Sequence, residues 1–449
     1  MSLLIHNVTI FTNDDRNAIL TGHAVAIEGS QITKVGPEAE LKKTCADFQQ
    51  LDGGGRLLLP GFVNAHMHFY GTFARGLALE KTPRNFYEIL SFLWWQLDKA
   101  LDLKSVYYSA LVQTISAVKH GVTAIVDHHA SPNAVEGSLD QIEEAMSLLG
   151  VRGVLCYEMS DRDGREICQK GLEENARYIQ KCRTARKLNP DHLYDAMVGL
   201  HASFTLDNGS LRRAAELSWA TDRGCHIHLL EDGVDRLLTQ EKYGTGVVKR
   251  LAEQGILGEK TIAAHGIHLQ NAEFDLLAST DTIVVHNPQS NMNNAVGRAD
   301  IFKLLDKKLL VGLGTDGMTA SILPDIRTAH LLHKHDLRNS NVGWAEIQKM
   351  AMKNNPRIFQ RLTGMKIGQV TPGYLADLIL VDYFPPTPMT EDNFWGHLLF
   401  GIADAAVDTT IINGRIVMQN KQIPGLDEEG IAAHARECAE GVWKRFAVS

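Results

Sequence analysis

The sequence predicts an α/β fold, a TIM-type (β/α)8 barrel with a small β-sandwich formed by both ends of the chain. Through the middle of the chain, apolar runs of strand length alternate with helix-period stretches, and about eight such runs occur. Polar or ionisable residues stand at the C-terminal end of nearly every run. This distribution favours a barrel, whose sites lie on that face, over an open sheet, whose ligands gather at one switch point.

Both ends of the chain are rich in short strands and turns. Residues 3–36 contain alternating runs joined at Gly29 and Ser30, where a hairpin is predicted. Asn413 and Gly414 form a second two-residue turn signal between two apolar runs. Neither end could bury its apolar face alone, so we expect the two ends to meet in one sandwich.

The predicted domain division follows from these patterns of strand-like and helix-like sequence. Residues 1–56 and 368–449 would make the composite sandwich domain, which includes a C-terminal helix from Glu428 to Phe446. Residues 57–367 would make the barrel, because strand and helix patterns alternate only there. No internal repeat or low-complexity segment interrupts either part.

The barrel is predicted to begin with the strand Leu57 to His68, which ends in two histidines. Side chains two apart on a strand point to the same face, so His66 and His68 would project together. Two imidazoles held this way can share a divalent ion, and imidazole suits zinc, iron, nickel and copper better than magnesium or calcium. A histidine pair can also be two ordinary polar residues, so the interpretation depends on the rest of the chain.

Later strand ends supply further groups for such a site. CHIHLLED places His228 at a strand end and Glu231 three residues later. A metal-assisted hydrolase needs both a ligand and a general acid or base. His265, His286 and Asp316 follow at the next strand ends, and in a barrel these ends converge. Alternatively, Asp316 could cap a helix and His265 could be a hydrogen-bonded core residue.

Composition narrows the class of protein. Lys+Arg 45 against Asp+Glu 53 gives a net charge of −8, and no basic block could follow a phosphate backbone, so we expect no nucleic-acid partner. No run reaches the roughly 18 apolar residues of a spanning helix, and the first residues lack a signal-peptide pattern. We therefore expect no membrane partner and a cytoplasmic location. The six cysteines have no ligand-like spacing and are expected to be reduced.

The order of these motifs resembles that of a known family. HMH on the first strand, histidine with a glutamate three residues later on the fifth, histidine on the sixth and TDG on the eighth resemble the amidohydrolase superfamily. The stretches LPGFVNAHMH, GLHASFT and HNPQSNM resemble its ATZ/TRZ-like branch of mononuclear deaminases and chlorohydrolases. The resemblance covers essentially the whole chain, including the strand-rich ends.

The resemblance implies a set of roles for these residues. One divalent transition metal per chain, zinc or iron, would be held by the ligands His66, His68, His228 and Asp316. Glu231 would be the proton shuttle, and His265 would hydrogen-bond the attacking water with help from Asp316. The binuclear branches carry a lysine at the end of the fourth strand, whereas this strand ends at His201, so we expect no second metal. The resemblance also implies a homodimer.

The predicted reaction is hydrolytic deamination of a purine- or pyrimidine-like nitrogen heterocycle, with release of ammonia. Ring-amide hydrolysis or dechlorination on the same metal centre is an alternative, and a non-catalytic metal-binding barrel is another. Glu231 argues against the last, since a storage site needs no proton shuttle. The residues expected to contact substrate are His201, Trp94 and Gln96, although the tryptophan stretch could equally be a core helix. Those expected to pack around the site are His128, His129, His226 and His268.

Overall fold

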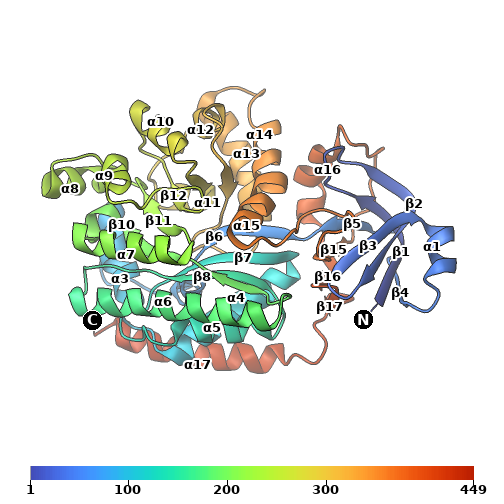
Figure 1. The fold of residues 1–449 in the computed structure, drawn as a ribbon, viewed down its shortest axis with the longest axis horizontal. Helices are drawn as coiled ribbons and strands as arrows, with labels where there is room; N and C mark the ends of the chain where they lie inside the picture. The colour runs from blue at the N-terminus through green and yellow to red at the C-terminus, as the bar shows by residue number, and fades with distance from the viewer. Residues whose placement is uncertain (1, 449) are drawn as a thin grey trace.

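The computed structural model describes residues 2–448, which form a mixed α/β fold with two parts (Figure 1). A sheet built from both ends of the chain lies on the right in the figure, and the larger part, in which parallel strands alternate with helices, lies on the left. Within residues 2–448, no helix has both the length and the apolar character needed to cross a membrane.

The end sheet contains eight strands in the order β17-β16-β15-β5-β1-β2-β3, with β4 beside β1. One edge of β1 pairs with β2, and its other edge pairs first with β4 and then with β5. This long strand therefore links the two ends in one hydrogen-bonded sheet, where two facing sheets were predicted. The strands are β1 (Ser2–Phe11), β2 (Ile19–Glu28), β3 (Gln31–Pro37), β4 (Gln49–Asp52), β5 (Leu57–Pro60), β15 (Leu378–Val381), β16 (Val407–Ile412) and β17 (Arg415–Met418).

Both predicted hairpins are present. Gly29, with φ of 61°, and Ser30 connect β2 to β3. Asn413 and Gly414 connect β16 to β17 with φ of 53° and 74°, the left-handed values that a type I′ turn requires.

The predicted strand from Leu57 to His68 is two strands in different sheets. β5 pairs with β15 and β1 in the end sheet, whereas β6 (Phe62–Met67) pairs with β7 (Val122–His129) in a parallel sheet. The change occurs at Gly61, where a Cβ would lie 2.3 Å from Thr123 Cγ2. β5, which the prediction places in the barrel, therefore pairs in the end sheet, and the chain passes between the sheets at a glycine because no Cβ fits there.

The remaining strands form two parallel sheets, in the orders β6-β7-β8-β9 and β10-β11-β12-β13-β14. Backbone bonds connect their edges: Met159 N donates to Gly199 O at 3.0 Å beside β8, and Thr315 N donates to His66 O at 2.9 Å beyond β14. The predicted fourth strand is split between β9 and β10. The bounds are β8 (Arg152–Tyr157), β9 (Tyr194–Ala196), β10 (Val198–Ala202), β11 (Cys225–Leu229), β12 (Ile262–His265), β13 (Ile283–His286) and β14 (Val311–Leu313).

Helices connect most consecutive parallel strands and cover them (Figure 1), and a few others, among them Glu38–Thr44 and Phe394–Phe400, lie in the connections of the end sheet. Before β13 they are α1 (Glu38–Thr44), α2 (Phe86–Ile89), the π-helix η2 (Leu90–Trp94), α3 (Trp95–Leu97), α4 (Leu103–Lys119), α5 (Ser138–Ser147), α6 (Arg165–Leu188), α7 (Asn208–Thr221), α8 (Gly233–Tyr243), α9 (Val247–Glu253) and α10 (Asn271–Ser279). After β13 they are α11 (Pro288–Asn293), α12 (Ile301–Asp306), α13 (Leu323–Leu337), α14 (Ala345–Gln348), the π-helix η4 (Lys349–Asn354), α15 (Asn355–Thr363), α16 (Phe394–Phe400) and α17 (Glu428–Phe446).

The last helix, α17, has the predicted bounds but not the predicted neighbours. It packs along α4 in the larger part of the molecule (Figure 1). Trp443 Nε1 donates to Phe73 O at 2.8 Å, and Arg445 Nε donates to Ala100 O at 2.6 Å. The helix, which the prediction groups with the end sheet, therefore contacts segments between residues 69 and 119.

Candidate metal centre and substrate pocket

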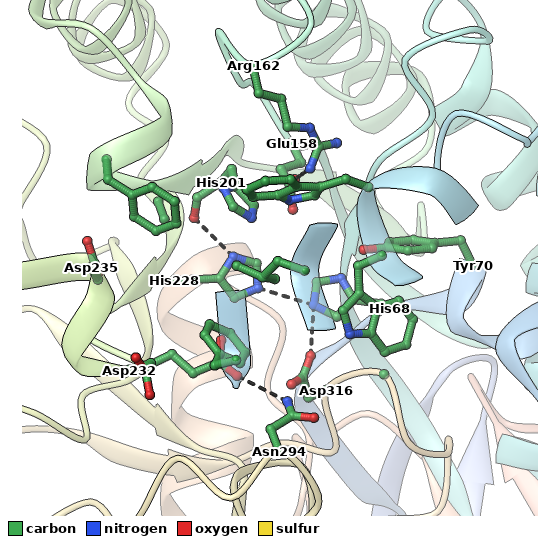
Figure 2. A pocket seen from close by; sticks show the side chains of 18 residues that line it. His68, Tyr70, Glu158, Arg162, His201, His228, Asp232, Asp235, Asn294 and Asp316 are labelled. Carbon is green, nitrogen blue, oxygen red and sulfur yellow. Dashed lines mark hydrogen bonds and ion pairs between the residues drawn. The ribbon is translucent and has the colours of Figure 1, made fainter. Parts of the chain in front are cut away.

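Histidines from three parallel strands converge on Asp316, which follows β14. His66 Nε2 lies 3.6 Å and His68 Nε2 lies 2.9 Å from Asp316 Oδ1. His228 Nε2, at the end of β11, lies 3.2 Å from His68 Nε2 (Figure 2). His265 Nε2, at the end of β12, lies 3.8 Å from Asp316 Oδ2. All these strand ends open on the same side, so residues far apart in sequence meet at one point.

Backbone carbonyls fix the protonation of two of these imidazoles. His68 Nδ1 donates to His128 O at 2.5 Å, and His228 Nδ1 donates to His201 O at 3.0 Å. Because a carbonyl oxygen can only accept, each ring carries a proton on Nδ1, so its Nε2 holds the lone pair whenever the ring is neutral. His66 Nδ1 contacts His226 Nε2 at 2.8 Å. Such outer contacts orient the imidazoles of metal sites.

The donor set fits a divalent metal ion. One potential ligand atom from each of His66, His228 and Asp316 lies within 4.8 Å of the others. His66 Nε2 is buried and has no hydrogen-bond partner among residues 2–448. Burial lowers the pKa of His66 to about 3, so its imidazole is neutral and can donate a lone pair. Imidazole nitrogen together with carboxylate oxygen suits zinc or iron.

The backbone of two site residues lies in the left-handed region. His265 has φ of 76° and Asp316 has φ of 54°, both unusual for residues other than glycine. Asp316 N donates to His66 O at 3.0 Å, and Ser290 Oγ donates to Asp316 Oδ2 at 2.5 Å. These contacts hold the carboxylate toward the histidines. Burial opposes its ionisation, but the neighbouring imidazoles of His66 and His68 prevail and hold the pKa of Asp316 well below its usual value.

Glu231 stands beside this centre, just after β11. Its Oε2 lies 3.4 Å from His265 Nε2, and its Oε1 accepts a hydrogen bond from Asn294 Nδ2 at 3.3 Å. Burial, followed by the charge of Asp316, raises the pKa of Glu231 well above its usual value. The carboxyl group therefore tends to retain a proton at the edge of the pocket.

The centre forms the floor of a pocket that encloses about 660 Å³, part of it open to solvent. The aromatic walls come from η2, α3 and the segments after β6 and β10 (Figure 2). The residues that line the pocket are His68, Tyr70, Phe86, Leu90, Trp94, Trp95, Glu158, Arg162, His201, Ala202, Phe204, His228, Glu231, Asp232, Asp235, Asn294, Asp316 and Gly317.

Two of the three residues predicted to contact substrate line this pocket, and one does not. His201 lies on the wall near His228, with Nδ1 2.7 Å from Thr205 Oγ1 (Figure 2). Trp94 lines the wall as well, whereas Gln96 donates to Ser91 O at 3.3 Å and lies in a separate hollow. Successive helical side chains turn by about 100°, so consecutive residues cannot all face one pocket. Gln96 therefore faces away from this pocket.

The histidines predicted to surround the site differ in their distance from it. His128 and His226 contact the imidazoles of the centre, as described above. His129 Nε2 contacts Ser131 Oγ at 2.9 Å, and His268 Nε2 contacts Val296 O at 2.9 Å.

Sequence reasoning missed Glu158 and Arg162. Glu158 Oε2 lies 3.3 Å from His128 Nδ1, and the Arg162 guanidinium lies 5.5 Å from the Trp95 ring. Glu158 follows β8 directly, which is the same signal that identified the other groups. A carboxylate after VRGVLCY could therefore have been recognised from its place at a strand end.

Comparisons with known proteins agree with this site. The sequence profile of the amidohydrolase family matches residues 57–417. The chain belongs to this family, and with it to the metal-dependent hydrolases that act on carbon–nitrogen bonds. This membership confirms the class of enzyme predicted from the sequence.

Relatives align along almost the whole chain. A 5-methylthioadenosine/S-adenosylhomocysteine deaminase of Pelotomaculum thermopropionicum is 29% identical over 444 residues, which cover 98% of either chain. A 5′-deoxyadenosine deaminase of Methanosarcina acetivorans is 30% identical over 444 residues, with the same coverage.

Solved structures show the same fold. An adenosine deaminase from Xanthomonas campestris with bound zinc superposes with a TM-score of 0.83 at 21% identity, covering 98% of both chains. Atrazine chlorohydrolase TrzN from Arthrobacter aurescens, complexed with zinc, has a TM-score of 0.81 at 21% identity and covers 97% of this chain and all of the other.

Proposed function

We propose that the protein removes the amino group from the purine ring of an adenosine-type nucleoside by hydrolysis. The observation that carries the proposal is the position of Glu231, a buried acid at the pocket edge beside convergent imidazole nitrogens and Asp316. Deaminases of such nucleosides are among its relatives. Water adds to the ring carbon that bears the amino group, and the amino nitrogen leaves as ammonia.

A single zinc or iron ion would be held by His66, His68, His228 and Asp316. The carbonyl bonds of His68 and His228 support this choice, because they leave both Nε2 lone pairs free. The ion would lower the pKa of a bound water to about 7.

The remaining chemistry is proton transfer and positioning by the chain itself. Glu231 donates its proton to the ring nitrogen next to the amino-bearing carbon, which makes that carbon a better acceptor for the water oxygen. Asp316 accepts one proton from the water and passes it to the amino nitrogen as ammonia leaves, and Glu231 recovers the second proton as the C=O bond forms. His265 orients the water by a hydrogen bond. His201 hydrogen-bonds the ring, and the indole of Trp94 forms an apolar wall for its flat face.

Two features of the architecture are part of the proposal. The bonds between β8 and β10 and between β14 and β6 support closure of both parallel sheets into one (β/α)8 barrel, in which all ligands lie at the C-terminal face. The end sheet would be a second domain built from residues 2–60 and 378–418, with α17 assigned to the barrel.

An ammonia-release assay tests the reaction. Zinc-loaded protein would be incubated with adenosine, 5′-deoxyadenosine, 5-methylthioadenosine and S-adenosylhomocysteine, and with atrazine for comparison. We expect ammonia and the corresponding inosine-type product from at least one nucleoside, and none from metal-free protein. Release of chloride from atrazine with no ammonia from any nucleoside would refute the proposal and favour the chlorohydrolase reaction.

A further inference from the structure

A line of buried polar side chains leads from His265, on the side away from the pocket, to the surface near α13. Asn291 Oδ1 lies 2.8 Å from His265 Nδ1, and Asn291 Nδ2 lies 3.5 Å from His286 Nδ1. His286 Nε2 lies 3.3 Å from His333 Nε2, and His333 Nδ1 lies 3.5 Å from Arg298 Nη1. Asn291 and the three histidines are completely buried.

At the outer end of this line, the direction of hydrogen-bond donation is fixed. A guanidinium carries only donors, so Arg298 must donate to His333 Nδ1. Arg298 is itself anchored through Nε to Asp336 Oδ2 at 2.6 Å. Burial and the charge of Arg298 lower the pKa of His333 to about 3, and burial together with His333 holds the pKa of His286 well below its usual value. Both rings are therefore neutral and each has one donor and one acceptor.

The direction of this outer hydrogen bond determines the direction of each hydrogen bond further in. His333 accepts at Nδ1, so its proton is on Nε2 and is donated to His286 Nε2. His286 then carries its proton on Nδ1 and donates it to Asn291. The oxygen of the Asn291 amide must therefore face His286, and its NH2 group must face His265.

This orientation of the Asn291 amide is the reverse of the one for which the distances above are given, with Oδ1 and Nδ2 exchanged. The two atoms have nearly the same size, so the exchange leaves the side chain in the same place. The opposite placement would protonate His286 on Nε2 and His333 on Nδ1. Two donors, His333 Nδ1–H and Arg298 Nη1–H, would then face each other. Only one direction of the line gives every contact a donor and an acceptor.

We propose that Arg298, acting through His333, His286 and Asn291, holds the proton of His265 on Nε2. His265 then presents an N–H group to the reaction centre, 3.4 Å from Glu231 Oε2 and 3.8 Å from Asp316 Oδ2. A protonated nitrogen has no lone pair for a metal. His265 is thus a hydrogen-bond donor to the water, whereas His68 and His228 face the same centre with lone pairs. This inference deepens the proposed function and rests on it for the role of the water.

The tautomer of His265 can be measured directly by ¹⁵N NMR of histidine-labelled, zinc-loaded protein without substrate. The signals of His265 are identified by their loss in His265→Asn. We expect the protonated nitrogen of His265 to be Nε2. Protonation at Nδ1 in the wild-type protein would overturn the proposal. Because the readout needs no substrate, it remains decisive even if no nucleoside is deaminated.

Two variants test the control exerted by the line. In Asn291→Asp, a carboxylate accepts from both neighbours, so we expect the proton of His265 to move to Nδ1. In Arg298→Met, the fixed donor is lost, and a second His265 tautomer should become detectable. The matched control is Arg327→Met, on α13 with His333, where the guanidinium bonds to Asp404 and does not contact the line.

The same variants separate positioning from folding. We expect kcat of Asn291→Asp to fall by about tenfold or more, with little change in KM. Metal content and thermal unfolding should stay near wild type. If Asn291→Asp and Arg298→Met both leave the His265 tautomer as in the wild type, the line does not control it and the proposal fails.

Discussion

His201 contributes its backbone and its side chain to two different tasks. Its carbonyl oxygen accepts the Nδ1 proton of His228 at 3.0 Å, which turns the Nε2 lone pair of His228 toward the metal centre. Its imidazole lines the pocket in which substrate would bind. The backbone contact persists whatever side chain stands at this position, so the two tasks can be separated by mutation.

Substitution of His201 should therefore affect substrate and leave the metal in place. Replacement by Ala or Asn removes one hydrogen bond to the ring and should lower kcat/KM. The decrease should correspond to roughly 1–3 kcal/mol of lost transition-state stabilisation. Steady-state kinetics and elemental analysis of the same samples check this. Unchanged kinetics would make His201 a packing residue, and an empty metal site would show that its side chain supports the ligands.

The metal content should be one divalent transition ion per chain. His228→Gln removes a central ligand, so we expect it to lose most of its metal and, since a bound ligand stabilises the folded state, to unfold at a lower temperature. Elemental analysis and calorimetry measure both. The control His434→Gln lies on the exposed face of α17 and should retain the ion. Two firmly held ions per wild-type chain would contradict the proposed ligand set.

Glu231→Gln should separate proton transfer from metal binding. Glutamine keeps the size of the side chain but cannot transfer the proton, so we expect kcat to fall by about 10²-fold or more with the metal retained. Glu253→Gln, an exposed change on α9, is the matched control. If Glu231→Gln loses its metal, Glu231 is a ligand and the assignment of roles is wrong.

Neither end of the chain should be dispensable. A fragment of residues 57–368 would retain β5 but lose its neighbours β1 and β15, which leaves an apolar strand without pairing on either edge. It would also lose α17, which covers α4. We expect this fragment to aggregate, as sedimentation and circular dichroism would show. A soluble and active fragment would contradict the structural role of the end sheet.

Sequence reasoning could predict which side chains meet at the site where their positions follow from strand periodicity. His66, His68, His228 and Asp316 stand at strand ends, and parallel strands bring such ends together whatever the details of packing. The direction of Gln96, away from the pocket, depends on the irregular helical turn at Leu90–Trp94, which residue spacing does not reveal.

The differences between the predicted and the observed fold have a similar origin. The change of sheet at Gly61 depends on its close approach to Thr123, a contact between segments far apart in sequence. The neighbours of α17 depend on tertiary packing, although its bounds follow from local periodicity. The tautomer of His265 depends on four further side chains, and only their joint geometry determines its direction.

The left-handed backbone at His265 and Asp316 has a consequence for laboratory evolution. Such conformations cost of order 1–3 kcal/mol in residues other than glycine, and asparagine or glycine adopts them more easily. A library of variants selected for heat resistance alone should therefore accumulate asparagine or glycine at these two positions. The selected proteins would have a higher melting temperature but would be inactive, because the two residues in strained backbone conformations are also the ones that face the reacting water.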